Sequence, residues 1–263
     1  MGKDKKERFA TASETARERP DRYVPDYEEI TEAPQRVVMA SAALQKRGKT
    51  RFAFTMPKPL AYMQLDANYE HVLAWARQTY CKKQKDAIRH LSYFADPRTD
   101  IKTANREVFD RFIKDYDYCI RNFRSVFIDT ASELLDVRKL AEWGRNTQIP
   151  QMYYGGFYAD FRWMVKEALK TDCNVNFIHR FKKEYRNDEW NGDYELEGWR
   201  GIVYETQVYV EHTREDQNFS TNILECAQNA RLMGMSLSSD DEDNDFASLA
   251  RKIYPASDLD DWQ

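Results

Sequence analysis

Several features that mark particular classes of protein are missing from this sequence of 263 residues. No apolar run approaches the roughly 18 residues of a membrane-spanning helix, so we expect no membrane association. The N-terminus, MGKDKKERFA, has no apolar segment and is therefore no secretory signal. The cysteines, Cys81, Cys119, Cys173 and Cys226, are far apart and show neither metal-ligand spacing nor a disulfide framework. We expect a cytoplasmic protein with free thiols.

An excess of positive charge is also absent, because the formal net charge is −4. The chain as a whole is therefore no basic nucleic-acid coat, and any contact with DNA or RNA needs a local patch. Apolar residues make up 42% of the chain and charged residues 32%, which allows a sizeable core beneath a well-solvated surface.

One glycine is missing from an otherwise recognisable loop in the stretch ASAALQKRGKTRFAF, residues 40–54. Gly48, Lys49 and Thr50 match the end of the phosphate-binding pattern G-x-x-x-x-G-K-[ST], but Ala43 occupies the position of its first glycine. The apolar run RVVMAS predicts a buried strand before the loop, and KTRFAFTM predicts a helix after it. This context favours a phosphate loop over a chance GKT on a helix.

Each residue type in such a loop has a physical task. Backbone N–H groups and the helix N-terminus bind phosphates, Gly48 permits close approach, and Lys49 reaches the β- and γ-phosphates from a helix start that we expect at the surface. The hydroxyl of Thr50 ligates Mg²⁺. The predicted nucleotide-binding residues are Ala43, Gly48, Lys49, Thr50 and Arg51.

Two further strands are predicted to end in polar residues of the same site. RSVFIDT, residues 124–130, ends in Asp129, which together with Thr50 is predicted to hold Mg²⁺ and its water shell. CNVNFIHRF, residues 173–181, places His179 near its end as a candidate phosphate sensor. The alternatives are a turn aspartate at a strand end and an ordinary core or surface histidine.

Strands and helices alternate along the chain, which predicts a mainly parallel sheet with helices on both faces. We expect strands at 36–41 and 59–67, a helix from 68 that gives way to a short strand at 92–96, helices over 103–122 and 157–171, and a strand or hairpin arm at 201–215. Residues 1–33 are predicted to be a polar arm, 34–236 the core, and 237–263 an acidic tail that builds no core.

The series RVVMASAALQKRGKTRFAFTMPKPLAYMQLDAN, RSVFIDTASELLD and NVNFIHRFKKEY resembles the RecA-like P-loop ATPases of bacteriophage recombination modules, the phage nucleotide-binding proteins associated with single-strand annealing. The resemblance covers roughly residues 35–215. It implies a RecA-like core with a charged β-hairpin after the histidine strand. Residue by residue, Lys49 and Thr50 match the loop, Asp129 the Mg²⁺ strand and His179 the sensor.

The resemblance also implies a function. A protein of this kind binds ATP with Mg²⁺, assembles into homo-oligomers, and acts on single-stranded DNA in phage recombination or replication. A single-strand-binding or annealing protein is the implied partner, and the cytoplasm of a bacterial host is the implied location.

Two departures from the pattern limit this inference. Ala43 replaces the first loop glycine, and Asn68 stands where the family places the glutamate that activates water. An asparagine orients a water but cannot take its proton. Asp66 or Glu70 is the candidate substitute, so the predicted catalytic residues are Asn68, Glu70 and His179. Slow hydrolysis is expected, and two alternatives stay open: a nucleotide-gated binding or structural protein, and a DNA-binding accessory factor with a vestigial loop.

Two stretches combine basic and aromatic residues, CKKQKDAIRHLSYF at 81–94 and HRFKKEYRNDEW at 179–190. Such a combination suits contact with the backbone and stacked bases of single-stranded DNA. Ordinary exposed faces of a helix or hairpin are the alternative.

Overall fold

The computed structural model describes residues 36–67, 69–81, 87–146, 148–186, 189–258 and 262. All of them belong to the compact unit Gln35–Gln263. The predicted polar arm, residues 1–33, lies outside the described residues. Among the helices of the described ranges, none has both the length and the apolar character needed to cross a bilayer.

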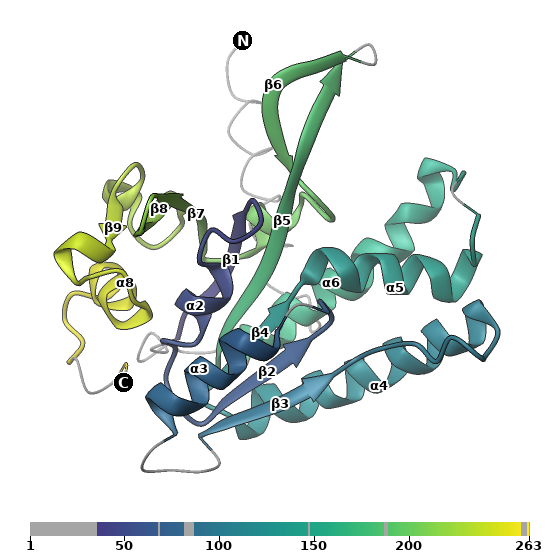
Figure 1. Cartoon of the computed structure of the whole chain (residues 1–263), viewed down its shortest axis with the longest axis horizontal. Coiled ribbons are helices and arrows are strands. Elements are labelled where there is room, and N and C mark those ends of the chain that lie inside the picture. The colour runs from purple at the N-terminus through teal and green to yellow at the C-terminus, as the bar shows by residue number, and fades with distance from the viewer. Residues whose placement is uncertain are drawn as a thin grey trace, which may run out of the picture. The chain divides into compact units, whose positions relative to one another are not determined.

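A nine-stranded sheet runs through the described part of the chain (Figure 1). The order across the sheet is β3 (Ile88–Ser92), β2 (Leu60–Gln64), β4 (Ser125–Asp129), β5 (Asn174–Arg186), β1 (Val38–Ala43), β7 (Val208–Glu215), β8 (Asn218–Cys226) and β9 (Ser236–Ser238), with β6 (Glu189–Leu196) paired to β5.

The first six strands of this order pair in parallel, whereas β8 is antiparallel to β7 and β9, and β6 to β5. The predicted mainly parallel sheet is therefore confirmed. Parallel strands place their carboxyl ends along one edge of the sheet, where α/β proteins bind ligands. The ends of β1, β2, β4 and β5 meet at this edge.

Helices cover both faces of the sheet, as predicted (Figure 1). One apolar cluster joins the sheet to α4 (Ile101–Asn122), α5 (Ala131–Trp143), α6 (Tyr154–Ala168) and α7 (Ile202–Glu205). The second joins the other face to α2 (Lys49–Ala53), α3 (Glu70–Tyr80) and α8 (Phe246–Ile253). Three short 3₁₀ turns complete the described elements: η1 (Gln151–Tyr153), η2 (Ala230–Leu232) and η3 (Ser239–Asp241).

The helix predicted over 103–122 is confirmed as α4, and its sequence explains both its start and its buried face. The carboxylate of Asp100 accepts a hydrogen bond from the Thr103 N–H at 3.1 Å, which satisfies a backbone donor that the first turn leaves free. Val108, Phe112 and Tyr116 recur every four residues and are buried against the sheet.

Two boundaries differ from the expectation. The helix that begins at Glu70 ends at Tyr80, and the strand expected at 92–96 lies earlier, as β3. Residues 88–92 pair in parallel with β2, and this pairing overrides the helix-like composition of the segment. The arm expected at 201–215 divides into the short helix α7 and strand β7.

The prediction that residues 237–263 form an acidic tail without a core is wrong. Phe246, Leu249, Ala250 and Ile253 form an apolar face at helical spacing along α8, and this face packs into the core together with Trp262, which is only 1% exposed. The carboxylate of Asp245 caps the helix by accepting a hydrogen bond from the Ser248 N–H at 2.7 Å. Acidic composition concealed this amphipathic pattern.

The charged hairpin expected after the histidine strand is present. Strand β5 continues beyond the sheet and returns as β6, so the two strands project from the rest of the fold (Figure 1).

Candidate functional site

The loop between β1 and α2 has the backbone conformation that its glycine requires. Gly48 has φ +95°, and a Cβ atom there would lie 2.6 Å from Cδ1 of Phe219, so a larger residue would strain the backbone and displace the Phe219 ring. Ala43 is the last residue of β1 and is not left-handed. Its methyl group is therefore tolerated where the loop pattern has glycine.

Lys49 is buried, only 9% exposed, rather than lying at the surface as expected. Its Nζ donates hydrogen bonds to the carbonyls of Ala43 at 3.3 Å and Leu44 at 3.2 Å, so the ammonium lies within the loop. Burial lowers the pKa of Lys49, and the charges of Asp129 and Asp66 oppose that shift. Helix α2 is only five residues long, so the phosphate-binding capacity of the loop depends on Lys49 and backbone N–H groups.

The structure brings Thr50 and Asp129 into direct contact. The Thr50 hydroxyl donates to Oδ2 of Asp129 at 2.7 Å, although the residues belong to different elements, α2 and β4. Burial raises the pKa of Asp129, against the hydrogen bond from Thr50 and the charge of Lys49. A cation at this point would therefore meet a hydroxyl and a carboxylate, the oxygen ligands that Mg²⁺ prefers.

No group of three or more His, Cys, Asp or Glu able to hold a metal is found among the described residues.

Asp66 follows β2 and lies beside Asp129. The N–H groups of Leu65 and Asp66 donate to the carbonyl of Asp129 at 2.7 and 3.1 Å. The charge of Asp66 also acts on the pKa values of both Lys49 and Asp129. Of the other candidates near this strand, Asn68 lies outside the described residues and Glu70 is exposed at the start of α3.

His179 is placed on the face of the sheet opposite to α2. Ile178 pairs with Asp129 and belongs to the cluster around α2, whereas Phe177 belongs to the cluster around α5, so strand alternation puts His179 on the α5 side. Its Nδ1 lies 3.2 Å from the Glu197 carbonyl, and a carbonyl only accepts, so Nδ1 carries the proton. Burial lowers the pKa of His179 to about 4.

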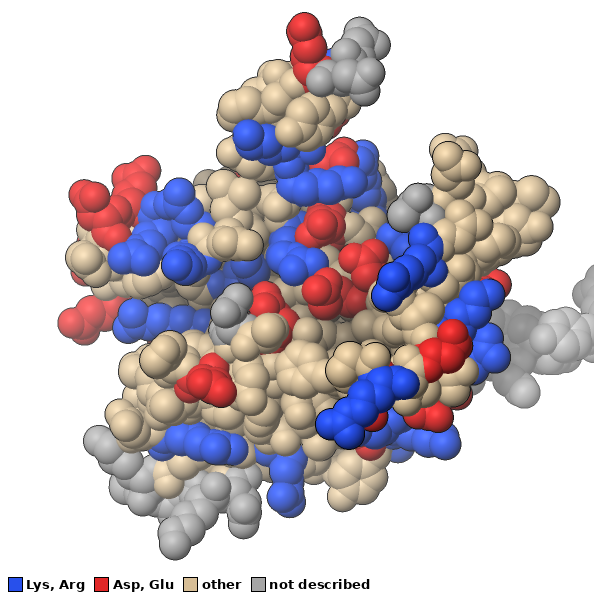
Figure 2. Space-filling view, turned by 45° about the vertical axis from the view of Figure 1, so that its right-hand side comes forward, with Lys and Arg blue, Asp and Glu red and all other residues tan. Residues whose placement is uncertain are grey.

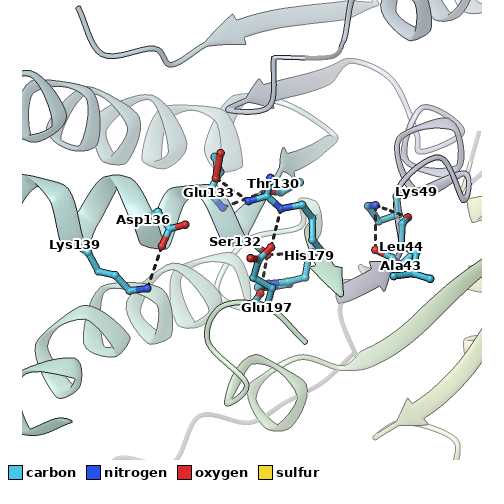
Figure 3. A network of polar contacts seen from close by, with 11 residues as sticks. Ala43, Leu44, Lys49, Thr130, Ser132, Glu133, Asp136, Lys139, His179 and Glu197 are labelled. Atoms are coloured by element: carbon cyan, nitrogen blue, oxygen red, sulfur yellow. Dashed lines mark hydrogen bonds and ion pairs between the residues drawn. The ribbon is translucent and has the colours of Figure 1, made fainter. Parts of the chain in front are cut away.

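Arg180, which the sequence did not single out, follows His179 near the carboxyl ends of the parallel strands. Its guanidinium forms ion pairs with Glu133 and Glu197, each at 2.8 Å. Figure 3 shows Ser132, Glu133, His179 and Glu197 grouped on one side of the strand ends, and Lys49 with Ala43 and Leu44 on the other. Arg180 lies two residues beyond Ile178, the residue of β5 that pairs with Asp129, so knowledge of this pairing would have identified it.

A pocket of about 250 Å³ lies on the other side of the loop, next to α2. We call it the base pocket; its lining includes Gly48, Arg51, Trp75, Phe219, Asn244 and Asp245. The Arg51 guanidinium lies 5.1 Å from the Trp75 ring centroid and 5.3 Å from that of Phe219. Flat rings and a planar cation suit the stacking of a planar heterocycle. No signal in the sequence identifies Trp75 or Phe219, because their proximity to the loop depends on the fold.

Strand order, the loop after β1 and the aspartate at the end of β4 together define a RecA-like P-loop fold. The crystal structure of the RadB recombinase is similar to this chain, with a TM-score of 0.50 and 16% identity over 78% of this chain and 87% of that one. At this identity the likeness concerns the fold. No protein-family model matches the sequence, and no curated protein matches it.

Proposed function

We propose that the chain is a Mg²⁺-dependent, ATP-binding RecA-like protein, with slow ATP hydrolysis, that acts on single-stranded DNA in phage-type recombination or replication. The observation that carries the nucleotide proposal is the 2.7 Å hydrogen bond between Thr50 and Asp129, next to the buried Lys49. A lysine, a hydroxyl and a carboxylate converge there from two elements, and helix capping alone requires no such convergence.

In this proposal each described residue has a physical task. Lys49 exchanges the carbonyls of Ala43 and Leu44 for phosphate oxygens, which satisfy its charge better. Thr50 and Asp129 hold the cation, whose role is to neutralise charge on the phosphates. Arg51, Trp75 and Phe219 sandwich the base, because the base pocket adjoins Gly48.

Hydrolysis needs a group that orients or deprotonates water. Asp66 is the carboxylate that the fold holds beside Asp129, and we assign it this task, with Asn68 orienting the water. Glu70 is a weaker candidate because its side chain is exposed. His179 faces α5, which favours a structural role for it over the predicted sensor role.

Binding without turnover is the second candidate function, and the polar residues after β2 favour it. Asn68 stands where the resembled family has the glutamate that activates water, and an asparagine cannot take a proton. Glu70 is exposed at the start of α3. Without turnover, nucleotide occupancy would regulate binding of a partner.

The hairpin is the proposed contact for single-stranded DNA. Tyr185, Trp190 and Tyr194 are exposed there, and the Lys183 ammonium lies 4.6 Å from the Trp190 ring centroid. Exposed rings stack with bases whatever their sequence. Basic and acidic side chains are interspersed on the face in Figure 2, so we assign the contact to this hairpin rather than to a broad basic surface. Homo-oligomers and an annealing or single-strand-binding partner belong to the same proposal.

Calorimetric titration with MgATP tests the nucleotide site. Lys49→Ala should abolish binding, while Lys166→Ala, the same change at an exposed position of α6, should bind as the wild type does. Circular dichroism should show that both variants are folded. Equal affinity of Lys49→Ala and wild type would contradict the proposal.

A further inference from the structure

Arg180 is a cation at the strand ends to which the nucleotide proposal gives no task. We propose that Arg180 is a catalytic residue that leaves its carboxylate partners to contact the terminal phosphate, and that this movement releases the base of the hairpin. The inference rests on the proposed function and adds to it an arginine supplied by the same chain.

The placement of Arg180 follows from strand register. Its Cα pairs with Ala43, the last residue before the phosphate loop. Two residues earlier on β5, Ile178 pairs with Asp129, and residues two apart on a strand share a face. By register the Cα–Cβ bonds of Arg180 and Asp129 therefore leave the same face of adjacent strands, and the Arg180 guanidinium extends from there to Glu133 and Glu197. The charge of Arg180 acts on the pKa values of both Asp129 and Lys49.

The ion pairs of Arg180 position its guanidinium but do not use all of its N–H donors. Glu133 bonds one terminal nitrogen and Glu197 bonds Nε, each at 2.8 Å. A guanidinium carries five N–H donors, so further donors remain for a phosphate oxygen. A terminal phosphate carries more negative charge than a carboxylate, so once these donors contact it, it can displace both Glu133 and Glu197.

Glu197 connects this arginine to the hairpin. Its side chain pairs with Arg180, its N–H donates to the Arg180 carbonyl at 2.8 Å, and its carbonyl accepts from Ser132 Oγ at 2.7 Å. Glu197 directly follows the last residue of β6, the strand that returns from the hairpin tip. Transfer of Arg180 to a phosphate removes the charged contact at the base of this return strand, while the ion pair between Lys182 and Glu195 stays further along it, so the base of the hairpin becomes sensitive to the nucleotide state.

A comparison of ADP with ADP–beryllium fluoride, which mimics the terminal phosphate, tests the proposal by calorimetry. Arg180→Ala should lose at least about tenfold in affinity for ADP–beryllium fluoride and keep its affinity for ADP. Arg162→Ala is the matched control, because Arg162 forms an exposed 2.8 Å ion pair with Glu205. Glu197→Gln should show the opposite sign, with a stronger preference for ADP–beryllium fluoride, because it weakens the competing contact.

Hydrogen exchange of residues 181–196 gives a second measurement. ADP–beryllium fluoride, but not ADP, should accelerate exchange there in the wild type, and Arg180→Ala should abolish the difference. If Arg180→Ala weakens ADP and ADP–beryllium fluoride equally, or neither, and Glu197→Gln leaves the preference unchanged, Arg180 is only a structural ion-pair partner. If wild-type protein binds neither ligand, the proposed function itself fails, and that result is distinct from the first.

Discussion

The two ends of the candidate site offer different kinds of contact. The phosphate end, made of Lys49, Thr50 and Asp129, is largely buried, charged and fixed by hydrogen bonds of 2.7–3.3 Å. The base pocket has an exposed arginine and partly exposed rings, with contacts of 5.1–5.3 Å. Buried charge-assisted hydrogen bonds are directional and strong, whereas ring contacts tolerate different partners. The phosphate end should therefore supply affinity and the base pocket selectivity.

The two ends also differ in what supports them. The phosphate end rests on adjacent parallel strands, whose carboxyl ends meet because of sheet topology. The base pocket depends on the C-terminal segment, where the Asn244 side chain donates to the Phe219 carbonyl at 2.7 Å and accepts from the Thr221 hydroxyl at 2.6 Å. A segment that looks like a tail by composition thus holds one wall of the pocket.

The largest expected effect is on hydrolysis at the phosphate end. Asn68→Glu should raise the steady-state turnover of ATP by about 10²–10⁴-fold over the slow hydrolysis assigned to Asp66, because a glutamate can take a proton from the water that Asn68 only orients. The gain should disappear in Asn68→Glu combined with Lys49→Ala. Unchanged turnover with intact ATP binding would mean that another residue already acts as the base or that the position does not face the water.

The next largest effect is expected at Asp129, the carboxylate that we propose binds the cation. Asp129→Asn should weaken Mg²⁺-dependent nucleotide binding by roughly 2–5 kcal/mol, as expected when a buried charged partner is truncated. Affinity measured without Mg²⁺ should change less. Asp110→Asn on the exposed face of α4 serves as the control. A wild-type Mg²⁺ titration in the Asp129 variant would show that the carboxylate has no part in holding the cation.

Measurements of the free energy of unfolding test whether the C-terminal segment that supports the base pocket is part of the folded core. Leu249→Ala should lower the free energy of unfolding by roughly 2–5 kcal/mol, because the leucine is completely buried in α8. Asp240→Ala, an exposed change in the same segment, should stay within about 0.5 kcal/mol. Chemical denaturation measures both. Equal stability of the two variants would show that this segment is a tail that contributes no core.

The smallest effect is expected at the base pocket. Phe219→Ala should weaken ATP binding by roughly 1–3 kcal/mol, the usual value for one stacked base, and leave tripolyphosphate binding unchanged. Tyr204→Ala removes an aromatic ring that is 91% exposed and controls for the general effect of such a change. Parallel losses for ATP and tripolyphosphate would show that Phe219 supports the loop rather than the base.

The sequence was informative where a signal is local and contiguous. Gly48, Lys49 and Thr50 form one motif, and Asp129 ends a plainly apolar strand, so the sequence alone identifies the loop and the aspartate. Arg180 was not predicted as a site residue because a shift of one residue along β5 moves a side chain to the other face of the sheet, and only the pairing with β4 determines that face. Trp75 and Phe219 escaped because tertiary packing alone brings them to the loop. The buried face of α8 was hidden by its acidic neighbours.

A crystal structure of the full chain with Mg²⁺ and a non-hydrolysable ATP analogue tests the central claim most directly. The account predicts phosphates against Lys49 and the N–H groups of the loop, the cation beside Thr50 and Asp129, and the base between Arg51 and Phe219. An analogue bound elsewhere, or a loop that keeps Lys49 on the carbonyls of Ala43 and Leu44 at saturating ligand, would contradict it.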